Sequence, residues 1–139
     1  MMLNRLRSPL AFVCLTALCI AGAARAEEPS AFSDRVQNGN KVEAAPEYSD
    51  YFTNHYFPSL GQPMADAIKS CAAQHHASSA KFALVSDLSA NGDFEKIEFQ
   101  PQSNVAWCFA EKVKTFHAPP PPYISGEGFP VVFEITITP

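Results

Sequence analysis

The sequence has few of the features that mark enzymes and nucleic-acid-binding proteins. It contains no Gly-x-Ser-x-Gly nucleophile motif, no His-Glu-x-x-His zinc motif and no phosphate-binding loop. Ten basic residues face fourteen acidic ones, so the formal net charge is −4, and the basic residues do not cluster. An acidic chain without a basic patch is a poor ligand for nucleic acid or anionic lipid. We therefore expect a protein that is not an enzyme, needs no cofactor and does not bind nucleic acid.

Histidine and cysteine are scarce as well, with four of each, and their spacing does not predict a metal site. Cys71 and His75 are one helical turn apart, but an oxidised Cys71 would not be a metal ligand. The neighbouring His75 and His76 would diverge by about 100° on a helix. His117 precedes a proline run and is expected in a loop. We predict no metal.

The first 26 residues have the pattern of a secretory signal peptide. Arg5 and Arg7 are followed by an uncharged apolar stretch from Pro9 to Ala24, which is short for the ~20 residues of a membrane-spanning helix. Small residues precede a potential cleavage site between Ala26 and Glu27. We expect residues 1–26 to be removed and the mature chain to reside in the periplasm, without membrane insertion.

Cleavage would change both the charge and the cysteine content. Three basic residues precede residue 27 and no acidic residue does, so seven basic and fourteen acidic residues remain, a formal charge of −7. Cys71 and Cys108 would be the only remaining cysteines, and an exported protein most simply pairs them. The chain-entropy model gives such a disulfide about 4 kcal/mol of stabilisation.

The mature chain divides into a leader and one domain. Residues 27–46 are polar and lack a hydrophobic period, which indicates a flexible leader. The aromatic segment from Tyr48 to Phe57 is too rich in aromatic residues for a linker. It is either a short helix packed on the domain or an exposed surface that binds a partner, and burial is the more common fate of aromatic residues. The domain is expected to span residues 47–139.

The pattern within the domain predicts the order helix, strand, strand, helix, strand. Apolar residues at helical spacing indicate a helix that starts at Pro63 and a second from Asn104 to Thr115. Residues 81–88 and 94–100 form a predicted hairpin around Asn91-Gly92, and residues 129–138 alternate as a third strand. Trp107, next to Cys108, is expected to pack on the sheet or the disulfide.

These elements predict an α+β fold with the order α-β-β-α-β. The hairpin makes the first two strands antiparallel, and the second helix returns the chain so that the third strand pairs antiparallel with the first. The predicted sheet is therefore three-stranded and antiparallel in the order 2-1-3, with two helices on one face. Two helices on the same face can bring Cys71 and Cys108 within bonding distance.

From Phe82 onward the sequence resembles the C-terminal domain of the periplasmic proteins TonB and TolA. The resemblance lies in the hairpin FALVSDLSANGDFEKIEF, the helix from Val105 to Thr115, the exit TFHAPPPP and the strand GFPVVFEITI. The helix that carries Cys71 is similar to the TolA variant, which also has a helix before its hairpin and a disulfide. Unlike TonB and TolA, this chain has a cleavable signal in place of a membrane anchor and long linker. Pro101-Gln102-Ser103-Asn104 replaces the family's Ser-Ser-Gly-like segment.

The resemblance implies a stand-alone periplasmic protein-binding module. Family members pair an exposed strand edge with an extended segment of a partner, here a periplasmic or outer-membrane protein. The predicted recognition edge is the last strand, with these partner-binding residues: Val131, Val132, Glu134, Thr136 and Thr138. An alternative is a periplasmic inhibitor or immunity-type protein that uses the aromatic segment or the proline loop as a wedge.

Overall fold

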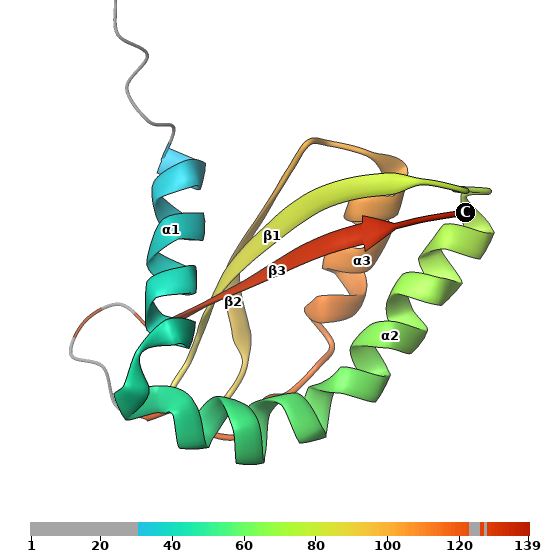
Figure 1. Ribbon diagram of the computed structural model, residues 1–139. Helices are drawn as coiled ribbons and strands as arrows, with labels where there is room; N and C mark the ends of the chain where they lie inside the picture. Colours follow the sequence, from blue (N-terminus) through green and yellow to red (C-terminus); the bar gives the residue numbers. More distant parts are fainter. Residues whose placement is uncertain (1–30, 123–125, 127) are drawn as a thin grey trace, which may run out of the picture.

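The computed structural model describes residues 31–122, 126 and 128–139, so the predicted cleavage site between Ala26 and Glu27 lies outside the described residues. Strands β1 (Ala80–Leu88), β2 (Phe94–Gln100) and β3 (Phe129–Ile137) form one antiparallel sheet in the order β2-β1-β3. Helices α2 (Phe57–Gln74) and α3 (Asn104–Val113) pack with it (Figure 1). The predicted fold class, strand order and antiparallel pairing are confirmed. No helix in the described part of the chain is long and apolar enough to span a membrane.

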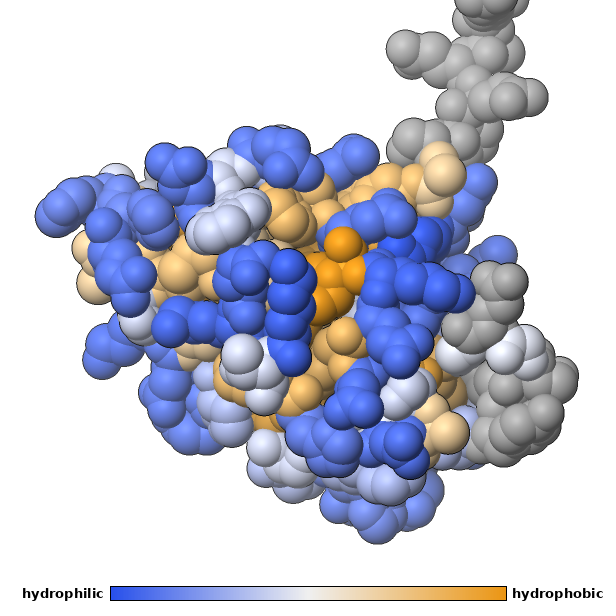
Figure 2. All heavy atoms as spheres, turned by 180° about the vertical axis from the view of Figure 1, so that it is seen from behind, coloured by the Kyte–Doolittle hydropathy of each residue, from blue (hydrophilic) through white to orange (hydrophobic). Residues whose placement is uncertain are grey.

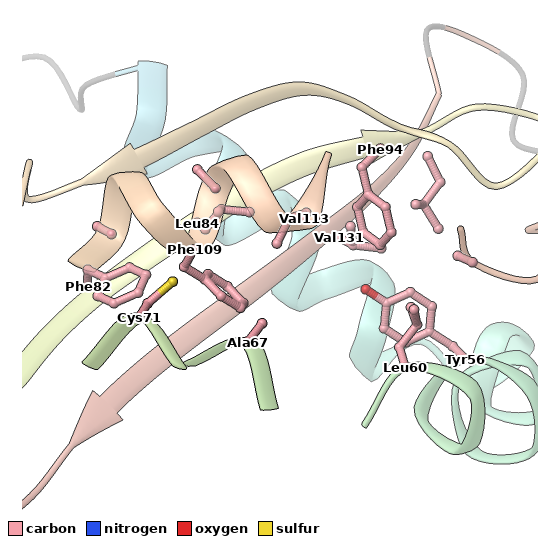
Figure 3. Close-up of a cluster of buried hydrophobic side chains, with 14 of the residues drawn as sticks. Tyr56, Leu60, Ala67, Cys71, Phe82, Leu84, Phe94, Phe109, Val113 and Val131 are labelled. Carbon is pink, nitrogen blue, oxygen red and sulfur yellow. The ribbon is translucent and has the colours of Figure 1, made fainter. Parts of the chain in front are cut away.

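The main core lies between the sheet and the helices α2 and α3. Leu84, in the middle of β1, is fully buried and pairs with Phe99 of β2 and Phe133 of β3. Phe109 of α3 is also fully buried and makes edge contacts with the rings of Phe82 and Phe133. Figure 3 shows Phe82 and Phe109 close to Cys71 of α2. Because alternate residues of each strand point to this face, the period-2 pattern of the sequence places the core correctly.

The disulfide between Cys71 and Cys108 joins α2 to α3. The two Cα atoms are 5.8 Å apart, within the usual range for a disulfide. Both cysteines are buried, and Cys71 is completely inaccessible to solvent. The pairing predicted from the sequence is confirmed.

The aromatic segment is a continuous helical stretch that leads into α2. A short 3₁₀ helix, η1 (Pro46–Tyr48), is followed by a π-helix, η2 (Tyr51–Tyr56), which passes directly into α2. Tyr51, Phe52 and Tyr56 are buried in the core. The interpretation of this segment as part of the core is therefore confirmed for these three rings.

The predicted start of this helix at Pro63 is wrong, because α2 begins at Phe57 and contains Pro63 in its interior. An interior proline removes one helical hydrogen bond and disfavours a helix by about 3 kcal/mol. The burial of the preceding aromatic rings offsets this penalty, since each large side chain gains ~1.5–3 kcal/mol on burial. Pro58 lies in the first turn of α2, directly after η2.

The predicted flexible leader over residues 27–46 is corrected by helix α1 (Ala31–Ala44). Phe32 and Gly39, seven residues or about two helical turns apart, are its buried residues. The sequence pattern hid this helix because a glycine occupies one of the buried positions, and glycine in a helix interior is usually unfavourable.

Helix α1 lies on the face of the sheet opposite to α2 and α3. Val85 and Val132 are cross-strand partners on that face, and Val85 is buried. A Cβ atom at Gly39 would lie 3.1 Å from the Cβ of Val132, a tight contact that the absence of a side chain avoids. Helices α2 and α3 therefore lie on one face of the sheet, and α1 lies on part of the other (Figure 1).

Arg35 fixes the first half of α1 against the sheet. Its guanidinium lies 2.9 Å from a carboxylate oxygen of Glu98 and 3.5 Å from one of Asp87. These carboxylates come from two different strands, so the single side chain holds the helix across both.

Candidate functional site at the open edge of the sheet

Strand β2 is one edge of the sheet, and its regular pairing is interrupted. The register with β1 shifts between Val85 and Asp87, where Lys96 has a φ of 49°. Arg35 of α1 donates a hydrogen bond to the Lys96 carbonyl oxygen at 2.8 Å. Bulges and charged side chains are the usual means by which proteins prevent another strand from pairing with an edge. The middle of the β2 edge is protected in this way.

Both ends of β2 are also closed to a further strand. Asp93, just before β2, forms an antiparallel bridge with His117, and its carboxylate lies 2.9 Å from the imidazole Nδ1 of that residue. The Ala118 N–H donates to the carbonyl oxygen of Gly92 at 2.9 Å. Gly92 has a φ of 93°, and a Cβ atom there would collide with the Ala118 carbonyl. Pro101 follows the strand and cannot donate to a neighbouring ladder.

Strand β3, the other edge, is regular over its whole length. It pairs with β1 from Phe129 to Ile137 without a register shift. Pro130 lies within this strand, opposite Asp87, and proline fits an edge strand where its nitrogen points away from the ladder. Successive residues of a strand direct their backbone groups to opposite sides, so Val132 and every second residue after it also point outward.

The structure separates the five predicted partner-binding residues. Val132, Glu134 and Thr136 share the outward backbone direction, and Glu134 and Thr136 have exposed side chains. Val131 is buried in the core, and its backbone is directed toward β1, so it is not part of the open edge. Thr138 is exposed but follows the last residue of β3.

A groove of about 310 Å³ runs along the β3 edge between α1 and α2. The lining residues come from all three elements: Asn40 and Glu43 of α1, Phe57 of α2, and residues 132–135 of β3. Figure 1 shows β3 between these two helices, which lie on either side of its edge. Phe57 is 48% exposed although it belongs to the aromatic segment. The sequence pattern did not single it out, because it looks like its buried neighbours.

Two carboxylates border this groove without a cation partner. No ion pair among the described residues involves Glu43 or Glu134, and the amide of Asn40 donates to Glu134 at 3.5 Å, the outer limit of a hydrogen bond. Partial burial, and then the negative charge of Glu134, raises the pKa of Glu43 above its ordinary value. Lys81 of β1 lies on the same face of the sheet but is paired with neither carboxylate.

Behind the groove, the buried Tyr56 hydroxyl has no hydrogen-bond partner in the part of the chain that the structure describes. Burial, together with the neighbouring Tyr51 and Glu43, raises the pKa of Tyr56 well above its ordinary value. The hydroxyl therefore remains protonated. Its ring stacks on Phe133 with centroids 6.5 Å apart, which links the aromatic segment to the edge strand.

Elsewhere on the described surface, a wider pocket of about 510 Å³ is lined by residues of all three strands, among them Lys81, Gln100 and Thr136. Trp107 is 59% exposed on α3, so the expectation that it packs on the sheet or disulfide is wrong. It lies on the outer face of a helix whose buried positions are taken by its neighbours Ala106 and Cys108. From the side opposite to Figure 1, hydrophilic residues surround a hydrophobic patch at the centre, and paler hydrophobic areas lie above it and to its left (Figure 2). Within the described ranges, no group of three or more histidine, cysteine or acidic side chains is placed to hold a metal ion.

A comparison of the chain with known protein families, curated proteins and solved structures found no match.

Proposed function

We propose that this chain is an exported protein-binding module that adds an extended segment of a partner protein to β3 as a further strand. The observation that carries the proposal is the contrast between the two edges. The β2 edge is interrupted by a bulge, capped by Arg35 and closed at both ends, whereas β3 is regular and borders a groove. Because exposed regular edges promote aggregation, an edge left open beside a protected one favours a binding role.

The periplasm is the compartment that we propose, with a periplasmic or outer-membrane protein as the partner. The sequence before Glu27 has the pattern of an export signal. The disulfide is compatible with an oxidising compartment. The resemblance to the TonB and TolA domains supports the same binding mode.

The alternative inhibitor or immunity-type role receives less support. Tyr51, Phe52 and Tyr56 are buried and therefore do not form an aromatic wedge. The Tyr51 hydroxyl donates to the Pro119 carbonyl oxygen at 2.8 Å, and burial raises the pKa of Tyr51 to about 12, so this donor stays protonated. The start of the proline run is thereby tied to the core.

Hydrogen exchange tests strand addition directly. Extended peptides selected on the immobilised protein from a displayed random library should slow exchange at the amides of Val132, Glu134 and Thr136, because a new strand would occupy these outward groups. The amides of Phe133 and Ile135, which already pair with β1, serve as internal controls. Selected peptides that protect the amides of α3 instead would contradict the proposal.

A matched pair of proline variants provides a second test. Thr136→Pro removes an outward donor, so the domain should stay folded and lose about 1 kcal/mol of peptide binding, or roughly fivefold in affinity. Ile135→Pro removes an inward donor from the β1 ladder and should destabilise the domain by about 3 kcal/mol. Unchanged peptide affinity of a folded Thr136→Pro variant would rule out pairing at this edge.

A further inference from the structure

The two sides of the β3 groove differ in chemistry. On the side of α1, the carboxylates of Glu43 and Glu134 lie together with the amide of Asn40. On the side of α2, the half-exposed ring of Phe57 lies near Phe133 and Ile135. The edge of β3 separates these sides, since Val132 and Glu134 point to the face covered by α1 and Phe133 points to the core.

Successive side chains of an added strand would contact the two sides of the groove alternately. Successive side chains of a strand point to opposite faces of the sheet, and side chains on one face contact those of the neighbouring strand. Every second residue of the partner would therefore lie against the carboxylates, and the residues between them would lie against Phe57. The charge and polarity of the two sides then specify the two sets of partner side chains.

The charged form of Glu43 is disfavoured in the free protein. Glu43 and Glu134 repel one another, neither has a cation partner among the described residues, and partial burial raises the pKa of Glu43. Groups that destabilise the free state yet border an open site are typical of functional residues. The buried hydroxyl of Tyr56 lies close enough to interact electrostatically with Glu43 and has no hydrogen-bond partner among the described residues.

We propose that the partner segment alternates basic and apolar side chains, with Lys or Arg facing Glu43 and Glu134 and apolar side chains facing Phe57. This inference rests on the proposed strand addition at β3. It specifies the chemistry of the partner, because cations on one face remove the carboxylate repulsion and apolar residues on the other cover the exposed ring.

Three synthetic heptapeptides test the inference on the mature, oxidised protein. The first alternates lysine and valine, the second alternates glutamate and valine, and the third contains the residues of the first in blocks. NMR titration of the protein amides should show the lysine–valine peptide binding about tenfold more tightly than the glutamate–valine peptide. The block peptide should bind more weakly than the alternating one, and added salt should reduce the lysine–valine affinity.

Variants then assign the preference to the groove. Glu43→Gln and Glu134→Gln should each weaken lysine–valine binding about threefold, and the pair should remove the preference over glutamate–valine. Glu95→Gln is the matched control, because Glu95 is an exposed carboxylate on the opposite edge strand and should leave binding unchanged. Phe57→Ser should weaken both alternating peptides, since it removes the apolar contact and not the charge.

The outcomes separate this inference from the proposed function. Selected peptides that protect the outward β3 amides but are acidic or uncharged would overturn the inference and leave strand addition standing. Equal affinity for the lysine and glutamate peptides, no binding of the lysine–valine peptide, or a full loss through Glu95→Gln would overturn it as well. Peptides that bind without protecting the β3 amides would overturn both.

Discussion

Strands β2 and β3 both pair with β1, and Phe99 and Phe133 flank the same residue, Leu84, from either side. Around these matched positions the two edges differ. The β2 edge has a register shift, a charged side chain bonded to its backbone and a β-bridge at its start, whereas β3 continues in register to its end. The difference shows that strand pairing alone does not decide whether an edge is available. Irregularity and neighbouring side chains decide it.

The largest expected effect concerns the disulfide, which supports α2 and α3 behind both edges. The double variant Cys71→Ser/Cys108→Ser should lose about 4 kcal/mol of unfolding free energy, because the cross-link restricts the unfolded chain over a sequence separation of 37 residues. Urea denaturation measures this loss, and a reducing agent should lower the stability of the parent but not of the variant. Equal stability of parent and variant would show that the helices do not depend on the link.

Phe133 on β3 and Phe99 on β2 allow the packing of the two edge strands to be compared directly. Phe133→Ala should cost about 3 kcal/mol, since its ring contacts those of Tyr56, Phe94 and Phe109. Phe99→Ala should cost less, about 2 kcal/mol, because no ring contact of Phe99 occurs among the described residues. Urea denaturation of both variants measures the two losses of unfolding free energy. A larger loss for Phe99→Ala would mean that the tighter packing lies at the β2 edge.

Arg35→Ala should expose the β2 edge. The change removes two ion pairs and the hydrogen bond to the Lys96 carbonyl, so we expect a loss of about 1–2 kcal/mol and weaker docking of α1. Faster hydrogen exchange in β2 and α1, with little change in β3, would confirm the protective role. Lys41→Ala, an exposed change on the same helix, is the control and should have no such effect.

The smallest effect is a pH-dependent gain of stability in Glu43→Gln. The pKa of Glu43 is raised in the folded protein, so the parent loses stability as pH rises from 4.5 through the higher folded pKa. The glutamine variant avoids this loss and should melt slightly higher at pH 7, with the difference disappearing below pH 4.5. Glu134 is the acidic group that opposes it from β3, and Tyr56 faces it from η2. A lower melting temperature at pH 7 would contradict the unfavourable role of this carboxylate.

Much of the fold follows from local sequence patterns. The alternating pattern of residues 129–138 predicted β3, and the turn at Gly92 predicted the hairpin. The position of the two cysteines on the apolar faces of two helices predicted the disulfide. Such features depend on neighbours in the chain. The strand order also followed, because a short hairpin and one crossover leave few arrangements.

The features that were missed depend on contacts between distant residues. Helix α1 packs on the sheet through the close contact of Gly39 with Val132, ninety-three positions later. A contact between such distant residues leaves no pattern in the local sequence. The exposure of Phe57 follows from the start of α2 before Pro63 and not from its own residue type. The candidate site was therefore predicted as a strand, while the helices that form its sides were not.

The absence of a side chain at Gly39 has a consequence for the dimensions of the groove. Gly39 and Glu43 are one helical turn apart and lie on the same side of α1, so they move together with the helix. A side chain at position 39 would require α1 or Val132 to shift by a few tenths of an ångström, and a shift of α1 would carry the Glu43 carboxylate away from β3. The missing side chain at Gly39 thus helps to set the width of the groove. That width in turn limits which side chains of an added strand can fit between α1 and α2.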